Sequence, residues 1–342
     1  MITARERNRA LLARQLLLER SPLSIPAALE QVAGLQTQHA PSGYIGLWTR
    51  MAGFQRESLT EALANRTVVQ ATLMRVTIHL VSARDYPLIS AAVREARRAG
   101  YLKVFKQDAR AVERAALRVR DLLAEGPRTR DELQAAIGVD NQVWYGVGLW
   151  VDMVRVPPSG TWERRRADLF DTAEAWLGTP ASEASPQDGM KLLVDRYLGG
   201  FGPARLKDIA TWAGVPPPAI KAALQRMQLE SFRDEAGGEL FDLPGAPLPG
   251  ADVPAPVRFL PTWDATLLVH ARRAGVLAEE HRPRVFNPRT PHSVPTFTVD
   301  GRVAGTWRLS HERVVIDPFA PLTAGVRREV ETEGERLSAF HA

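Results

Sequence analysis

Cysteine is absent from this chain of 342 residues. Its absence excludes disulfide bonds, cysteine nucleophiles and zinc fingers, and it suits a reducing compartment. Long apolar runs are missing as well. The uncharged stretch nearest in length to a membrane span, between Glu30 and Arg50, contains three glutamines, His39 and Pro41, so it would not sit in lipid. Residues 1–7 lack the apolar core of a secretion signal. We therefore expect a cytoplasmic protein without a membrane partner.

Lysine is also scarce, so arginine carries most of the positive charge. The formal net charge is +5, and the sequence pI is about 9.8. Between Arg94 and Arg120, nine basic residues face three acidic ones, which leaves the rest of the chain near −1. Charge concentrated in this way indicates a polyanion partner, with nucleic acid first. The other interpretation is an arginine-rich helix face that is merely solvated.

The order of predicted elements recurs three times, in residues 1–107, 108–180 and 181–245. Each unit combines three short helices with a β ribbon, which is the order of a winged helix. In the third unit, Gly199–Gly202 is expected to end a helix and Gly214 to turn the chain. A generic three-helix unit is the alternative for one copy, but three copies favour DNA binding. The helices are expected at residues 3–19, 26–32, 58–65, 111–124, 130–137, 141–153, 190–198, 203–212 and 217–227.

Residues 246–342 are expected to form a β-rich C-terminal region. A stretch dense in proline and glycine, 243–256, leads into it as a linker. Two strand patterns within 295–309 flank Asp300-Gly301, a pair that favours the type I′ turn of a β-hairpin. The last helix runs from about residue 324 to 339. The fold class is therefore α+β and mainly helical.

Several familiar catalytic and cofactor motifs are missing. The chain has no phosphate-binding loop, no dinucleotide fingerprint and no serine nucleophile elbow. His270, His281 and His292 are eleven residues apart and share no predicted helix, so they make a poor metal site. We expect neither a cofactor nor a metal.

The segment Gln36-Thr37-Gln38 remains as the candidate for chemistry. Gly34 and Pro41 oppose a helix on either side of it, and in an extended segment the two glutamines point to the same face. The two amides are then expected to lie side by side. Two polar loop residues without a task are the alternative, because glutamine is mostly an exposed residue.

Three segments resemble the HTH_42 winged-helix DNA glycosylases, in particular their AlkZ-like group, which is linked to azinomycin self-resistance. They are Gln36-Thr37-Gln38, residues 75–82 (RVTIHLVS) and residues 260–268 (LPTWDATLL). Together with the repeats, the resemblance covers nearly the whole chain. It implies tandem winged helices in a C-shaped scaffold around double-stranded DNA. It also implies hydrolysis of the N-glycosidic bond of alkylated purines, with unhooking of interstrand crosslinks by some members.

The resemblance assigns the catalytic roles to Gln36 and Gln38, while Thr37 departs from the aliphatic middle residue of the family motif. A purine alkylated at N7 or N3 is cationic and leaves easily, so amides that orient a water suffice. Gln38 stands where some members have aspartate, which would add negative charge near the developing cation. No lysine lies near the motif to form a Schiff base, so the expected action is monofunctional.

Further residues are candidates for support and for DNA binding. His79 could contact a phosphate or the water, with a structural histidine as the alternative; Asp264 could be a supporting carboxylate or a turn residue. The resemblance matches residues 295–309 to a hairpin that probes DNA. The candidates for DNA binding are Arg94, Arg97, Arg98, Arg302 and Trp307, although a tryptophan on this hairpin could equally belong to the core.

Two other functions stay open at this point. The first is a non-catalytic winged-helix DNA-binding protein such as a transcription regulator, and the second is a sensor that binds crosslinks without cutting them. Regulators usually dimerise on symmetric half-sites, and the sequence shows no coiled coil. We expect a monomer at the nucleoid, bound to DNA that carries alkylated or crosslinked purines.

Overall fold

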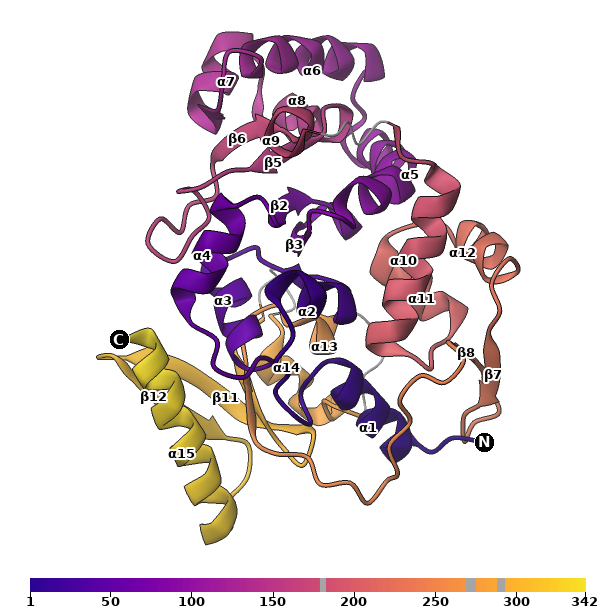
Figure 1. The fold of residues 1–342 in the computed structure, drawn as a ribbon, viewed down its shortest axis with the longest axis vertical. Helices are drawn as coiled ribbons and strands as arrows, with labels where there is room; N and C mark the ends of the chain where they lie inside the picture. The colour runs from indigo at the N-terminus through magenta and orange to yellow at the C-terminus, as the bar shows by residue number, and fades with distance from the viewer. Residues whose placement is uncertain (179–182, 269–274, 288–292) are drawn as a thin grey trace.

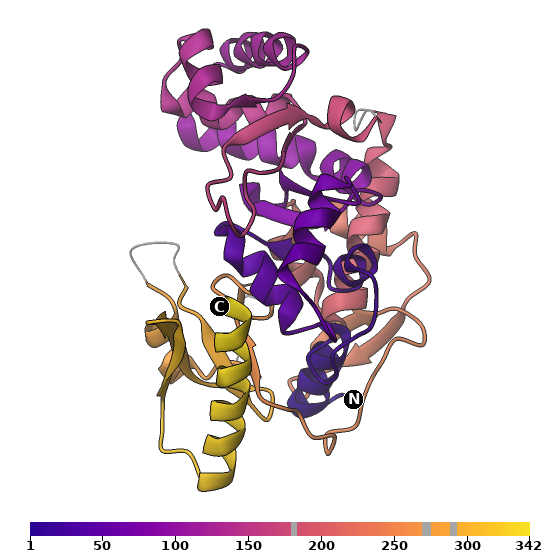
Figure 2. The same ribbon diagram turned by 60° about the vertical axis from the view of Figure 1, so that its left-hand side comes forward.

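The computed structural model describes residues 1–178, 183–268, 275–287 and 293–342. Helices and antiparallel sheets share the chain, so the fold is α+β, as the sequence predicts. The hairpin of β2 and β3 lies near the middle of the molecule (Figure 1). The α6–α8 group lies on one side of it, the α10–α12 group on another, and the C-terminal sheet with α15 on a third (Figures 1 and 2).

The central sheet has six strands in the order β1-β3-β2-β5-β6-β4, and every pair in it is antiparallel. The first two predicted units therefore share one sheet through the pairing of β2 with β5. The β ribbon of the first unit is the hairpin of β2 and β3, because the chain turns at Met74–Val76. The strands are β1 (Leu35–Gln36), β2 (Val68–Thr72), β3 (Ile78–Ser82), β4 (Arg128–Thr129), β5 (Met153–Arg155) and β6 (Leu169–Thr172).

Of the first helices, α1, α2 and α4 were predicted, whereas α3 and α5 were not. The N-terminal helix ends at Arg14 instead of residue 19, because the Gln15 side chain donates to Gly200 across the fold and Leu16 turns left-handed. Pro41 lies in the first turn of α3, where proline is favoured, and does not prolong the extended segment. The helices are α1 (Ala4–Arg14), α2 (Ile25–Gln31), α3 (Ala40–Trp48), α4 (Arg56–Ala64) and α5 (Tyr86–Phe105).

Helices α6, α7, α8, α11 and α12 lie close to their predicted ranges, α9 was not predicted, and α10 is longer than expected. Helix α10 continues through Gly199 and Gly200, where a break was expected. A side chain at Gly200 would meet the Gln31 carbonyl oxygen at 3.1 Å, so the glycine permits close packing of α10 on α2. The helices are α6 (Ala109–Leu123), α7 (Arg130–Ile137), α8 (Asn141–Trp150), α9 (Ala173–Leu177), α10 (Pro186–Phe201), α11 (Leu206–Ala213) and α12 (Pro217–Leu224); the hairpin β7 (Glu230–Arg233) and β8 (Glu239–Asp242) follows them.

The C-terminal region is a four-stranded sheet in the order β12-β11-β10-β9, with α15 packed on it. The predicted hairpin is present, and both turn residues, Asp300 and Gly301, have the positive φ of a type I′ turn. Its elements are β9 (Arg258–Leu260), α13 (Ala265–Leu268), α14 (Arg282–Val285), β10 (Thr296–Val299), β11 (Arg302–Ser310), β12 (Arg313–Pro318) and α15 (Ala324–His341).

Buried ion pairs tie the N-terminal segment to distant parts of the chain. Arg14 binds the Asp242 carboxylate at 2.6 and 2.8 Å, and both side chains are almost completely buried. Arg50 likewise binds Asp264 at 2.9 and 3.0 Å. A buried charge that loses its partner is strongly destabilising, so these pairs fix how the parts of the chain meet.

No helix among the residues that the structure describes is long and apolar enough to cross a membrane. Of the three histidines weighed as metal ligands, His270 and His292 lie outside the described residues. His281 contacts the Phe319 ring at 4.5 Å between ring centroids.

Removal of the Asp242 carboxylate is expected to destabilise the whole fold. We expect Asp242→Ala to lower the free energy of unfolding by about 3–5 kcal/mol, because Arg14 stays buried without its counter-charge. In the exposed pair Arg327–Glu331, Glu331→Ala should cost less than about 1 kcal/mol. Urea denaturation of both variants measures the difference, and equal losses would contradict it.

Candidate functional site

Gln36 and Gln38 lie on an extended segment at the edge of the central sheet. Strand β1 pairs with β3 so that Leu35 faces Leu80 and Gln36 faces His79. The Thr37 amide then donates to the Ile78 carbonyl oxygen at 2.8 Å, which prolongs the ladder by one residue. The predicted extended geometry of the segment is therefore present.

Both glutamine carbonyls are held by groups of the β2–β3 hairpin. The Gln36 Oε1 atom accepts from the Arg75 guanidinium at 3.0 Å, and the Gln38 Oε1 atom accepts from the Ile78 amide at 3.0 Å. Gln36 is half-buried and Gln38 is exposed. A carbonyl oxygen has two lone pairs, so each retains capacity to accept a second hydrogen bond. The amides are thus oriented from one side and able to receive a water.

Thr37 points to the opposite face, into the core. Its methyl group packs on Gly43 of α3, where a Cβ atom would stand only 2.8 Å from Thr37 Cγ2. Among the residues that the structure describes, none hydrogen-bonds the buried Thr37 hydroxyl. The middle position of the motif is therefore an apolar packing site, which suits the aliphatic residue that the resemblance implies there.

Arg75 was not singled out from the sequence, yet it links the motif to a distant helix. Its guanidinium binds both Gln36 and the carbonyl oxygen of Trp212 in α11. Burial lowers the Arg75 pKa to about 10, so it stays charged at neutral pH. Arg75 and Val76 both adopt positive φ, a strained conformation for side chains of this size. No local sequence signal marks such a turn.

His79 lies beside Gln36 but is buried. Its Nδ1–H donates to the Thr77 carbonyl oxygen at 3.0 Å. Burial, together with the nearby Arg75 charge, lowers the His79 pKa to about 3. The ring is therefore neutral at physiological pH and does not reach a phosphate. This placement corrects the expected phosphate contact and favours the structural alternative.

Asp264 lies beneath α3, in the ion pair with Arg50. It also accepts from the backbone amide and the hydroxyl of Thr266. Burial would raise its pKa, but the Arg50 charge together with the hydrogen bonds from Arg50 and Thr266 outweighs burial and lowers the pKa. Because Arg50 also donates to the Gly46 carbonyl oxygen at 3.0 Å, Asp264 is tied to α3, the helix that follows the motif.

The three arginines of α5 expected on DNA are used inside the protein. Arg94 pairs with Asp152 at 2.8 Å, and Arg98 donates to the Leu149 carbonyl oxygen at 2.9 Å. Arg97 is buried and donates to the Thr72 carbonyl oxygen. Helix α5 packs on α8 and on the β2–β3 turn, so the expected phosphate contact of the buried Arg97 is corrected to a packing contact. Arg94 and Arg98 are half-buried, and their phosphate contacts stay predictions.

The hairpin matched to DNA probing is also anchored in the protein. Trp307 is buried, and its indole N–H donates to Leu260 at 3.0 Å. At the tip, Asp300 pairs with Arg5, and Asn8 donates to the Gly301 carbonyl oxygen at 2.8 Å. The tip therefore docks on α1, which leaves Trp307 unavailable to a DNA groove. Arg302 remains exposed at the start of β11.

The next hairpin, β11–β12, has an exposed tip. His311 and Glu312 form its turn, and both have positive φ. Because neither is glycine, the sequence carries no standard signal for this turn. Of the two hairpins, the one at residues 295–309 has its tip docked on α1, whereas the β11–β12 tip is exposed to solvent.

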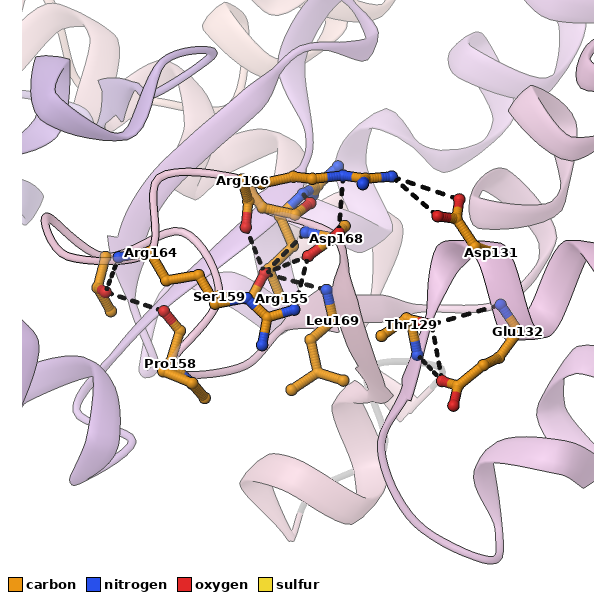
Figure 3. Close-up of polar contacts among 12 residues, drawn as sticks. Thr129, Asp131, Glu132, Arg155, Pro158, Ser159, Arg164, Arg166, Asp168 and Leu169 are labelled. Carbon is orange, nitrogen blue, oxygen red and sulfur yellow. Dashed lines mark hydrogen bonds and ion pairs between the residues drawn. The ribbon is translucent and has the colours of Figure 1, made fainter.

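A basic loop lies between β5 and β6. Its arginines were not among the residues predicted to bind DNA. Arg164, Arg165 and Arg166 are consecutive and exposed. Ser159 fixes the loop, because its hydroxyl donates to the Arg166 carbonyl oxygen and accepts from the Asp168 amide at 2.7 Å (Figure 3). Three consecutive arginines in the sequence are the signal that could have predicted this basic loop.

This loop reaches the motif. Burial and the nearby Arg165 charge together lower the pKa of His39, the residue after Gln38. A cleft of about 550 Å³ also has Gln38 in its wall, together with Arg166. Among the described residues, no group of acidic or histidine side chains could hold a metal ion. The arrangement offers oriented amides with cations nearby.

Comparisons with known proteins agree with this chemistry. A family model described as DNA glycosylase AlkZ-like matches residues 29–340. An interstrand DNA cross-link repair glycosylase from Streptomyces sahachiroi is 24% identical over 95% of this chain and 93% of its own length. The solved structure of the DNA glycosylase AlkZ from that organism has a TM-score of 0.83, at 20% identity, covering 99% of this chain and 97% of that one. The family match spans nearly the whole chain, so the chain belongs to the AlkZ-like DNA glycosylases, hydrolases that cut N-glycosidic bonds.

Proposed function

We propose that this glycosylase removes purines alkylated at N7 or N3 from double-stranded DNA, and that Gln36 and Gln38 are its catalytic residues. The observation that carries the proposal is the fixed orientation of both amide oxygens by Arg75 and the Ile78 amide. Interstrand crosslinks through such purines are included in the substrate class, in line with the name of the Streptomyces sahachiroi relative.

The amides position a water molecule and do not ionise. The water oxygen forms a bond to C1′ while the C1′–N9 bond breaks, and its electron pair neutralises the cationic purine. The water proton passes to solvent, since an amide is too weak a base to keep it. Because the leaving group is already charged by alkylation, the enzyme contributes orientation and no strong acid. The product is an abasic site with no covalent intermediate on the enzyme.

Arg75 and His79 act as positioning residues in this proposal. Arg75 occupies one lone pair of the Gln36 carbonyl and so aims the other at the water. The buried, neutral His79 fills the space beside Gln36 in register across β1 and β3. Asp264 supports α3, the helix that follows the motif, through Arg50.

The scaffold is proposed to be a set of tandem winged helices. Helices α6–α8 with β5 and β6 support a unit at 108–180, and α10–α12 with β7 and β8 support one at 181–245. Residues 1–107 form the first unit and 246–342 the β-rich region. We propose that this C-shaped arrangement clasps duplex DNA as a monomer at the nucleoid.

The DNA contacts are proposed to come from the exposed cations beside the motif. Arg164, Arg165 and Arg166 would bind phosphates, which position a duplex without reading its sequence. Arg302 and the β11–β12 tip at His311 and Glu312 would touch DNA farther from the cleavage point. These contacts are independent of the glutamine pair, so affinity and cleavage can be separated.

Replacement of both glutamines is expected to abolish base release and spare DNA binding. We expect Gln36→Ala/Gln38→Ala to lower the release of N7-methylguanine from a duplex by more than about 100-fold, with affinity changed by less than about threefold. Alkali-labile strand breaks measure release, and an unmodified duplex is the control. Unchanged release would remove the catalytic role. Tight binding without release by the wild type would instead favour a regulator or a crosslink sensor.

Thr37→Val is expected to preserve activity and to stabilise the fold slightly. The valine fills the same space against Gly43 and removes a buried hydroxyl that lacks a partner, which should add up to about 1 kcal/mol to the free energy of unfolding. Thermal unfolding and the release assay check both expectations. A clear loss of activity in this variant would show that the hydroxyl takes part in the reaction.

The pH dependence of activity and that of stability should differ. Neither an amide nor His79 titrates between about pH 6 and about pH 8, so single-turnover release should be flat there. His79 has a pKa of about 3 when folded and about 6.5 when unfolded. Between these two pKa values, the unfolded state binds more protons at His79 than the folded state does. The contribution of His79 to the free energy of unfolding is therefore complete above about pH 6.5 and falls toward about pH 3. His79→Gln should reduce the fall, and a bell-shaped rate profile near neutrality would contradict the mechanism.

A further inference from the structure

The basic loop between β5 and β6 carries one large buried aromatic side chain, Trp162, which is 8% exposed. Its ring packs against three others, with centroids 5.6 Å from Tyr44, 5.6 Å from Phe340 and 5.1 Å from His341. Tyr44 belongs to α3, the helix that follows the motif, and the other two belong to the last turn of α15. Trp162 therefore fastens the loop to two elements outside its own sheet.

Hydrogen bonds fix the rest of this loop. Gln70 of β2 donates to the Gly160 carbonyl oxygen at 2.9 Å. The Thr161 hydroxyl donates to the Pro158 carbonyl oxygen at 2.8 Å and accepts from the Arg164 amide at 3.2 Å. A side chain on an ordered loop loses less conformational freedom when it binds a ligand. The arginines of this loop are thus presented on a support that is already in place.

The three consecutive arginines of the loop differ in their partners. Arg164 pairs with Asp168 at 3.3 Å. Arg166 pairs with both Asp131 and Asp168 (Figure 3). Within the described part of the chain, no carboxylate forms an ion pair with Arg165, and its side chain is exposed. Arg165 is therefore the arginine of this loop whose charge no neighbouring carboxylate balances.

Trp162 orients the Arg165 guanidinium. The Arg165 Nε–H donates to the Trp162 carbonyl oxygen at 3.4 Å, and the guanidinium carbon lies 5.6 Å from the centre of the Trp162 ring. The face of a tryptophan ring attracts a cation at this distance. Burial, together with the charges of Arg165 and Arg56, lowers the pKa of His341 to about 4. This neighbour of Trp162 is therefore neutral near pH 7 and does not repel the guanidinium.

Arg165 lies near the glutamine pair. Burial and then the Arg165 charge lower the pKa of His39, the residue after Gln38, and Arg166 shares the wall of a cleft with Gln38. An unbalanced cation at this place would oppose the positive charge of an alkylated purine and of the sugar as the bond breaks. An anion bound to Arg165 removes that opposition, and the anion that a duplex offers is a phosphate.

We propose that Arg165 binds one of the two phosphates that flank the lesion nucleotide, and that Trp162 is the positioning residue that holds Arg165 there. This assignment rests on the proposed function, because a lesion must lie at Gln36 and Gln38 for its own phosphate to reach the loop. The ligand is a single phosphodiester of the duplex. Because the Nε–H already has a partner, the two Nη groups are left to bind that phosphate.

The test removes the charge of one phosphate at a time. Each duplex carries one N7-methylguanine, with a neutral methylphosphonate at either flanking phosphate or, as a control, one helical turn away. Chromatography measures the free base released. We expect one flanking methylphosphonate to lower the wild-type kcat/KM by about tenfold or more, as the loss of a hydrogen bond between charged groups does. Arg165→Ala should lower kcat/KM on the natural backbone by a similar factor. In this variant the same methylphosphonate should cost less than about twofold, because the contact is already lost.

The role of Trp162 is tested by two variants that keep the side chain apolar. Trp162→Phe retains a ring for the guanidinium, so kcat/KM should fall by less than about threefold and the methylphosphonate effect should remain. Trp162→Leu retains apolar bulk without a ring. It should resemble Arg165→Ala, with the methylphosphonate effect reduced to less than about threefold. A general loss of stability would lower release from every duplex equally. A Trp162→Leu variant that keeps the full methylphosphonate effect would therefore overturn the positioning role.

A matched arginine control and the remaining outcomes complete the test. Arg327→Ala removes an exposed arginine near the start of α15, roughly 20 Å along that helix from His341, and should change neither the rate nor the methylphosphonate effect. Equal methylphosphonate effects in the wild type and in Arg165→Ala would overturn the phosphate contact while the proposed function stands. A wild type insensitive at both flanking phosphates would overturn it as well. Failure of the wild type to release the base from any duplex would refute the proposed function and this inference with it.

Discussion

The pairing of β1 with β3 is the constraint on which the site depends. Strand β1 is only two residues long and lies at the edge of the sheet, so few hydrogen bonds hold it. Gly34 precedes it with a φ of +78°, and a side chain there would stand 2.9 Å from Val81. Thr37 then locks the segment against α3. This alternation places the glutamines on one face and the packing residues on the other.

This constraint explains how a site without acidic or basic catalysis can be organised. An amide contributes only through its orientation, so its neighbours matter more than its own pKa. Arg75 and the Ile78 amide supply that orientation from the adjacent hairpin, and the strained turn at Arg75 and Val76 is held by packing against Gly214. In the proposed mechanism the alkylated purine supplies the charge, and the enzyme supplies the geometry.

The sequence predicted the parts of the structure that follow from local rules. The extended glutamine segment, the helix order of the second and third units and the Asp300-Gly301 turn all follow from short-range preferences. The burial of Arg97 and Trp307, and the docking of the 295–309 tip on α1, depend on contacts between residues far apart in the chain. Charge alone could not separate the arginines that pack α5 from the exposed run at Arg164–Arg166.

Three arginine–aspartate ion pairs show that some arginines serve the interior and others the surface. Arg14 and Arg50 form buried ion pairs with Asp242 and Asp264. Arg166 instead pairs with Asp131 at the surface, and its side chain stays exposed to solvent. The net positive charge of the chain is therefore a poor guide to the DNA-binding face. Exposure beside the motif is the better guide, because a phosphate must reach the cation.

The most direct test of the account is a double-mutant cycle on the two glutamines. Single-turnover release of N7-methylguanine would be measured for the wild type, for Gln36→Ala, for Gln38→Ala and for the double variant. If the two amides place one water together, each single variant should lose nearly as much rate as the double variant, because residues that act as a unit are strongly non-additive. Single losses that multiply to give the double loss, or one glutamine without effect, would contradict the claim that the pair acts as one device.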